Sequence, residues 1–124
     1  MSGADSRALG RWGEALAAEE YRRRGLRVTA AGFTSRYGEI DLIAEDDKYI
    51  AFIEVKLRKS DRFAPARAFV DQKKQEKLLL TAQYYLMKHP SELQPRFDVV
   101  EIYAPDGRET KHPVINVIEN AFTA

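Results

Sequence analysis

The stretch EIDLIAEDDKYIAFIEVK, residues 39–56, decides the fold. GEIDLIAE (38–45) and YIAFIEVKLR (49–58) have the composition of strands, and the short polar link between them predicts antiparallel pairing. Charge interrupts both apolar runs: Asp41 lies in the first, and Glu54 and Lys56 lie in the second. Ionisable side chains are seldom fully buried unless they are paired or bind a metal. The stretch therefore predicts neighbouring strands that share one polar site.

The flanking sequence predicts helices and further strands around this pair. A helix should start at Asp5 or Ser6, run to about Arg24 and end at Gly25. A second helix is expected from about Asp71 to Lys88, between the third and fourth strands, as a crossover connection. The remaining strands are expected in LRVTAAGFTS (26–35), RFDVVEIYA (96–104) and PVINVIENAF (113–122). The order α-β-β-β-α-β-β predicts an α/β fold with a mixed sheet flanked by helices.

Length and composition indicate an ordinary globular protein. The chain has 124 residues, 44% of them hydrophobic and 31% charged, which suits one domain over residues 1–124. It contains no cysteine, so disulfides and zinc–thiolate sites are excluded and a reducing, cytoplasmic setting is expected. The N-terminus lacks the apolar core of a signal peptide, and no stretch reaches transmembrane length. We therefore expect an intracellular protein with no membrane partner.

Positive charge is concentrated after the third predicted strand. The net charge of the chain is only +1, but residues 56–77 contain eight basic residues against three acidic ones, a local net charge of +5. Such a block beside a carboxylate-bearing strand suits a polyanion such as nucleic acid. The alternative is a solvated loop and helix face with no ligand.

Strand alternation places the charged residues relative to one another. Asp41 should share a face with Glu39 and Ile43, while Ile40, Leu42 and Ala44 take the other face. Glu54 and Lys56 share a face of the next strand, so pairing across the short turn brings Asp41 near Glu54.

Two adjacent carboxylates repel each other unless a cation lies between them or one is protonated. Mg²⁺ or Mn²⁺ would suit their oxygens, and Lys56 could orient or help deprotonate an attacking water. This arrangement suits metal-assisted hydrolysis of a phosphodiester. The alternative is a cross-strand salt-bridge cluster on a solvated face, which contributes little energy.

GEIDLIA (38–44) followed by FIEVKLR (52–58) resembles the paired signature of the YraN family. These are small bacterial proteins related to archaeal Holliday-junction resolvases within the PD-(D/E)xK nuclease superfamily. The resemblance covers nearly the whole chain and includes GRWGEALAAEEY, RFDVV and INVIENAF. It implies a restriction-endonuclease-like mixed sheet and a metal-dependent endodeoxyribonuclease.

The resemblance also implies roles for single residues. Asp41 matches the metal-binding aspartate, although Ile40 stands where the superfamily has proline. Glu54 matches a metal ligand, the carbonyl of Val55 completes the metal shell, and Lys56 matches the catalytic lysine. Glu14 matches an acidic residue that approaches the metal in resolvase-like relatives; the alternative is an ordinary surface glutamate. A polar residue facing the site is expected at one of four positions: Gln72, Lys73, Lys74 or Gln75.

DNA is the partner expected from this resemblance, and a homodimer is expected because a four-way junction has two-fold symmetry. The residues predicted to contact phosphates are Arg58, Lys59, Arg62, Arg67, Lys73 and Lys74. Two other functions remain open. One is a nucleic-acid-binding module of the same fold that does not cleave, and the other is an assembly component that uses a sheet edge near PVINVI.

Other conspicuous residues have structural explanations. His89 and His112 each precede a proline, which indicates loop or capping positions. Arg96 and Asp98 suit a structural ion pair, and the arginines at 22–24 suit a helix C-terminus. Trp12 and Phe69 are expected in the core rather than as base-stacking platforms.

Overall fold

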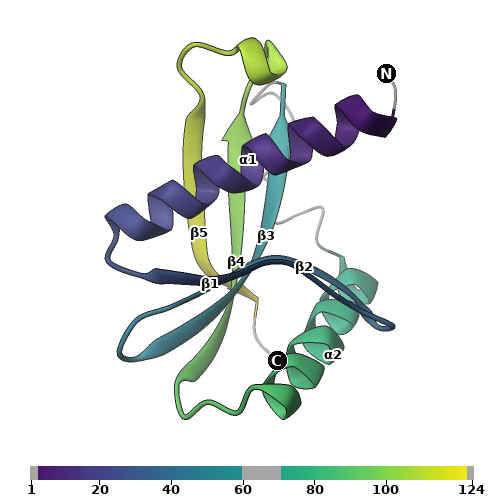
Figure 1. The fold of residues 1–124 in the computed structure, drawn as a ribbon, viewed down its shortest axis with the longest axis vertical. Coiled ribbons are helices and arrows are strands. Elements are labelled where there is room, and N and C mark those ends of the chain that lie inside the picture. Colours follow the sequence, from purple (N-terminus) through teal and green to yellow (C-terminus); the bar gives the residue numbers. More distant parts are fainter. Residues whose placement is uncertain (1–2, 60–70, 123–124) are drawn as a thin grey trace.

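The computed structural model describes residues 3–59 and 71–122, so Arg62, Arg67 and Phe69 lie outside the described residues. These described residues form two α-helices, five strands and one 3₁₀ turn (Figure 1). Their bounds are α1 Gly3–Arg23, β1 Arg27–Ser35, β2 Gly38–Glu45, β3 Tyr49–Arg58, α2 Gln72–Lys88, β4 Gln94–Tyr103, η2 Gly107–Glu109 and β5 Val114–Phe122. Neither described helix is long and apolar enough to cross a membrane.

The strands form one mixed sheet in the order β1-β2-β3-β4-β5. Neighbouring strands are antiparallel except β3 and β4, which are parallel and are connected through the segment that contains α2. The predicted antiparallel pairing of β2 with β3 and the predicted crossover helix are both confirmed. The α/β class with a mixed sheet flanked by helices is confirmed as well.

Each face of the sheet carries one apolar core, and α1 lies across one of these faces (Figure 1). The core under α1 is built around Tyr21, Leu42, Ile53 and Ile102, and the core beside α2 contains Ile43, Phe52, Leu78 and Val99. Gly13 allows α1 to approach β3 closely, because a Cβ there would lie 3.1 Å from Leu57 Cδ2. Trp12 packs partly buried against the α1 core, as predicted.

The face predicted for Ile40 is wrong. Ile40 packs with Ile43 and Phe52 in the α2 core rather than with Leu42 and Ala44. The ladder between β2 and β3 runs only from Leu42↔Ile53 to Glu45↔Ile50, so strict alternation is no longer imposed on the earlier residues of β2. The β1–β2 hairpin turns toward α2 there (Figure 1), and a Cβ at Gly38 would lie 3.2 Å from Thr81 Oγ1.

The structure confirms the predicted end of α1 but not its predicted start. Gly25 ends the helix as predicted: its φ is +91°, and the Leu26 N–H donates to the Tyr21 carbonyl at 3.0 Å in a Schellman arrangement. The predicted start is wrong, because the helix begins at Gly3 rather than after Asp5 or Ser6. An acidic residue is favoured throughout the first turn and not only at the cap, so it does not fix the first residue.

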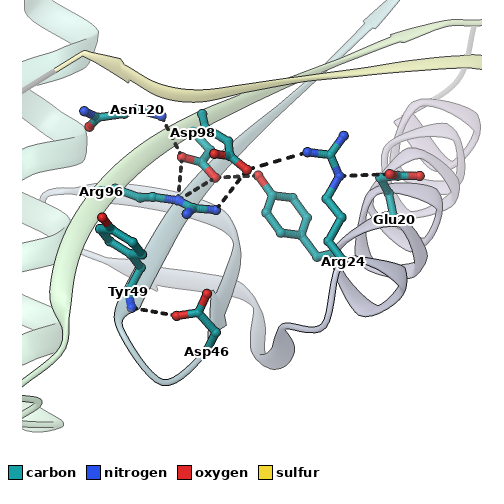
Figure 2. Close-up of polar contacts among 9 residues, drawn as sticks. Glu20, Arg24, Asp46, Tyr49, Arg96, Asp98 and Asn120 are labelled. Atoms are coloured by element: carbon teal, nitrogen blue, oxygen red, sulfur yellow. Dashed lines mark hydrogen bonds and ion pairs between the residues drawn. The ribbon is translucent and has the colours of Figure 1, made fainter.

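A buried polar cluster joins α1 to β4 and β5 (Figure 2). Asp98 is 1% exposed and accepts hydrogen bonds from the Tyr21 hydroxyl at 2.8 Å, from Arg96 Nε at 3.2 Å and from the Asn120 N–H at 2.9 Å. Asn120 has a φ of +51° at an irregularity in the β4–β5 pairing, and the Asp98 carboxylate satisfies its N–H. The predicted structural ion pair of Arg96 with Asp98 is confirmed.

We expect Asp98→Ala to destabilise the fold by about 3–5 kcal/mol, because it leaves the buried guanidinium of Arg96 and two further donors without their acceptor. Urea unfolding followed by circular dichroism would measure the loss. Asp47→Ala, at an exposed position of the β2–β3 turn, is the control and should change stability by less than about 0.5 kcal/mol. Equal effects of the two substitutions would contradict the structural role.

Candidate active site

Asp41 and Glu54 lie at the fork where β2 and β3 separate. They are the next residues after Leu42↔Ile53, the last pair of the antiparallel ladder at this end. Beyond that pair, the side chain of Asp41 on β2 accepts the Val55 N–H through Oδ2 at 2.8 Å. The fork therefore holds the Asp41 carboxylate beside β3, next to Glu54, as the register predicts.

Glu54 is a buried carboxylate that two lysines neutralise. The residue is 6% exposed, and its Oε1 lies 2.7 Å from Lys74 Nζ and 3.3 Å from Lys56 Nζ. Lys56 comes from the same face of β3, as alternation predicts, whereas Lys74 comes from the first turn of α2. Of the four positions left open on that helix, Lys74 reaches Glu54 with its side chain. Glu54 is buried while Lys56 and Lys74 are partly exposed, so the cluster lies at the boundary between the core and the solvent.

The environment of Asp41 strongly favours its protonated form. Burial raises the pKa of Asp41 to about 7, with a further upward contribution from the charge of Glu54. The hydrogen bond from the Val55 N–H lowers this pKa, and the charges of Glu14 and Glu39 raise it. The pair Asp41 and Glu54 keeps a mutual repulsion when Asp41 is ionised, even with two lysines on Glu54, and a divalent cation would relieve it. The hard carboxylate oxygens of the pair suit Mg²⁺ or Mn²⁺.

Glu14 approaches this cluster from α1. Burial raises the pKa of Glu14, followed by the charge of Glu39, while Arg11 lowers it and Glu54 raises it. Within residues 3–59 and 71–122, no three histidine, cysteine, aspartate or glutamate side chains lie close enough together to hold a metal ion jointly. Glu14 is thus an electrostatic neighbour of the pair, and its role at a metal stays a prediction.

The sequence analysis did not assign Glu39 and Arg11 to the site, although their spacing from Asp41 and Glu14 indicates it. Glu39 is two residues before Asp41 on the same strand, and Arg11 is three residues before Glu14 on the same helix. Both line a groove of about 1020 Å³ between α1 and the β1–β2 hairpin, together with Arg7 and Glu14. The groove therefore brings Glu14 and Glu39, the two acidic neighbours of Asp41, to one open surface.

The basic residues predicted to contact phosphates differ in their exposure and in their ion-pair partners. Lys59 and Lys73 are exposed, while Arg62 and Arg67 are outside the described residues. The Arg58 side chain is only 9% exposed and lies 3.6 Å from Glu101, which also accepts the Tyr103 hydroxyl at 2.7 Å. Arg58 is thus engaged within the sheet, because Glu101 on the parallel strand β4 is itself buried.

The structural explanations for the remaining candidates agree with the fold. His89 is the C-cap of α2, and its N–H donates to the Tyr85 carbonyl at 2.8 Å. Arg23 and Arg24 pair with Glu20 at 2.8 and 2.9 Å near the C-terminus of α1.

Comparison with known proteins places the chain in a family. The model of "Uncharacterised protein family UPF0102" matches residues 13–102. The chain belongs to the UPF0102 family. A UPF0102 protein of Syntrophomonas wolfei is 42% identical over 118 residues, covering 94% of this chain and 99% of that relative. A UPF0102 protein of Vibrio vulnificus is 42% identical over 120 residues, covering 94% of this chain and 93% of the relative.

These findings confirm the YraN resemblance, because UPF0102 is the family to which that signature belongs. A UPF0102 protein of Caldanaerobacter subterraneus is 37% identical over 123 residues, covering 98% of this chain and 100% of the relative. The matched range contains Glu14, Asp41, Glu54, Lys56 and Lys74, so the whole acidic and basic cluster lies inside the UPF0102 region.

The raised pKa of Asp41 predicts a pH dependence of stability. Between pH 4 and 7 the metal-free folded protein keeps a proton on Asp41 that the unfolded chain has released, so this group favours folding less as pH rises. Asp41→Asn should therefore gain stability relative to the wild type as pH rises from about 5 to 8. Urea titrations of both proteins in EDTA across this range would measure the difference. A difference that is independent of pH would contradict the raised pKa.

Proposed function

We propose that this UPF0102 chain is a nuclease with a restriction-endonuclease-like fold, which hydrolyses nucleic-acid phosphodiesters with Mg²⁺ or Mn²⁺. The observation that carries the proposal is the pair of the partly buried Asp41 and the buried Glu54 at the fork of β2 and β3, with Lys56 and Lys74 on Glu54. The resemblance of the two strand motifs to the PD-(D/E)xK superfamily and its archaeal junction resolvases supports the same reaction.

The donor set defines what each residue would do. Asp41 and Glu54 would hold the cation, with the Val55 carbonyl as a further ligand, and the Val55 N–H keeps the Asp41 carboxylate in place. A bound divalent ion would lower the pKa of water and offset charge on the phosphate. Lys56, whose side chain is 30% exposed and whose ammonium lies 3.3 Å from Glu54, would orient the attacking water and stabilise the negative charge that develops on the phosphoryl oxygens.

Basic residues beside the site would hold the substrate. Lys59 follows β3 directly, Lys73 precedes Lys74 at the start of α2, and both are exposed. Arg62 and Arg67 lie between them in sequence and complete the proposed phosphate contacts. DNA in the cytoplasm is the proposed substrate. A homodimer acting on branched DNA is the form that the resolvase resemblance favours.

We expect Glu54→Gln and Lys56→Met to lower metal-dependent cleavage by at least about 100-fold, since both remove groups that act on the reacting phosphate and water. A labelled panel of linear duplex, single strand, flap and four-way junction with Mn²⁺ or Mg²⁺ would measure this and identify the preferred substrate. Lys48→Met, in the exposed β2–β3 turn, is the matched control and should cleave at the wild-type rate.

The same panel separates the rival functions. Cleavage that survives in a correctly folded Glu54→Gln variant would overturn the proposed site. Binding without cleavage by the wild type would favour a nucleic-acid-binding module of this fold. Neither binding nor cleavage, together with salt-insensitive self-association, would favour an assembly component that pairs through the β5 edge.

Lys73→Gln and Lys59→Gln should each weaken nucleic-acid binding similarly for all sequences. Each substitution should also reduce the slope of log affinity against log salt by about 1, as expected when one phosphate contact is lost. Fluorescence anisotropy in EDTA at several NaCl concentrations would measure these slopes. Arg27→Gln, on the exposed part of β1 and paired with Glu45, is the comparison that should leave the slope unchanged.

A further inference from the structure

Lys74 makes the shortest ion pair at the proposed site. Its Nζ lies 2.7 Å from Glu54 Oε1, closer than Lys56 Nζ at 3.3 Å on the same oxygen. The Glu54 side chain is 7% exposed and that of Lys74 is 40% exposed, so the lysine reaches a buried carboxylate from a partly exposed position. Lys74 therefore occupies one of the two oxygens that Glu54 could offer to a metal ion.

The position of Lys74 in α2 is unfavourable for the helix itself. The N-cap is Asp71, whose side chain accepts the Lys74 N–H at 2.8 Å, and the first turn contains no acidic residue. Lys73 and Lys74 instead place positive charge at the positive end of the helix dipole. The contact with Glu54, outside the helix, offsets this local cost for Lys74.

We propose that Lys74 is a resident counter-ion that a divalent metal ion must displace from Glu54. The inference rests on the proposed function, since it takes Asp41 and Glu54 as the metal-binding pair. Without metal, the ammonium of Lys74 neutralises Glu54 and limits its repulsion of Asp41. When a metal ion binds Glu54, its charge repels the ammonium of Lys74, and the partly exposed Lys74 side chain is free to move outward while Lys56 stays on β3.

Removing Lys74 should therefore strengthen metal binding and weaken the metal-free fold. We expect Lys74→Met to bind Mn²⁺ at least about tenfold more tightly than the wild type in isothermal titration calorimetry without nucleic acid. Its metal-free melting temperature should fall by several degrees and recover when Mn²⁺ is added. Lys73→Met is the matched control: the same charge is lost one residue away, at an exposed position, so at 0.15 M salt screening should keep its Mn²⁺ affinity within about twofold of the wild type.

Displacement can be distinguished from general charge repulsion by labelling the amines. In the wild type, Mn²⁺ should increase the acetylation rate of Lys74 by an N-hydroxysuccinimide ester, measured by mass spectrometry, while the rate at Lys73 stays constant. An unchanged rate at Lys74 in protein that binds Mn²⁺ would overturn displacement, and so would equal Mn²⁺ affinities of wild type and Lys74→Met.

These readouts separate the inference from the proposed function. Mn²⁺ binding that shows displacement without any cleavage would support the counter-ion role and overturn the nuclease. Cleavage by the wild type together with an unchanged Mn²⁺ affinity in Lys74→Met would support the nuclease and overturn the counter-ion role. Failure of wild type and Lys74→Met alike to bind Mn²⁺ would overturn both.

Discussion

The buried carboxylate of Glu54 is the constraint on which the rest of the site depends. A charge that is 6% exposed needs nearby compensation, and β3 supplies only Lys56 from its own face. The second lysine has to come from another element, and Lys74 on α2 provides it at 2.7 Å. This contact ties the start of the crossover helix to the strand it follows.

The carboxylates of Asp98 and Asp41 belong to the same sheet but have different donors and charges around them. Asp98 has the Tyr21 hydroxyl, the Arg96 guanidinium and the Asn120 N–H as donors, so its charge is fully satisfied (Figure 2). Asp41 has the Val55 N–H and is surrounded by the negative charges of Glu54, Glu14 and Glu39. The hydrogen bonds of Asp98 hold α1, β4 and β5 together. Around Asp41, burial and neighbouring negative charge raise its pKa to about 7.

The net charge of residues 56–77 does not show which of their basic side chains are exposed and which pair with acids of the fold. Residues 56–77 carry a net charge of +5, yet Lys56, Arg58 and Lys74 are engaged with buried glutamates of β3 and β4. Of the described basic residues named for phosphate contact, Lys59 and Lys73 are exposed. Part of the positive block therefore compensates acids inside the fold, which a sum over the sequence cannot separate from a binding surface.

The sequence by itself determined the strands, the antiparallel β2–β3 pair and the placing of Asp41 beside Glu54 and Lys56. These follow from side-chain alternation and a short turn, which are local rules. Only the tertiary structure decided that Lys74 reaches Glu54, that Arg58 pairs with Glu101, and that Ile40 turns into the α2 core. The rotation of a helix about its axis, the partner of a buried charge and the point where a ladder ends all depend on packing between elements distant in sequence.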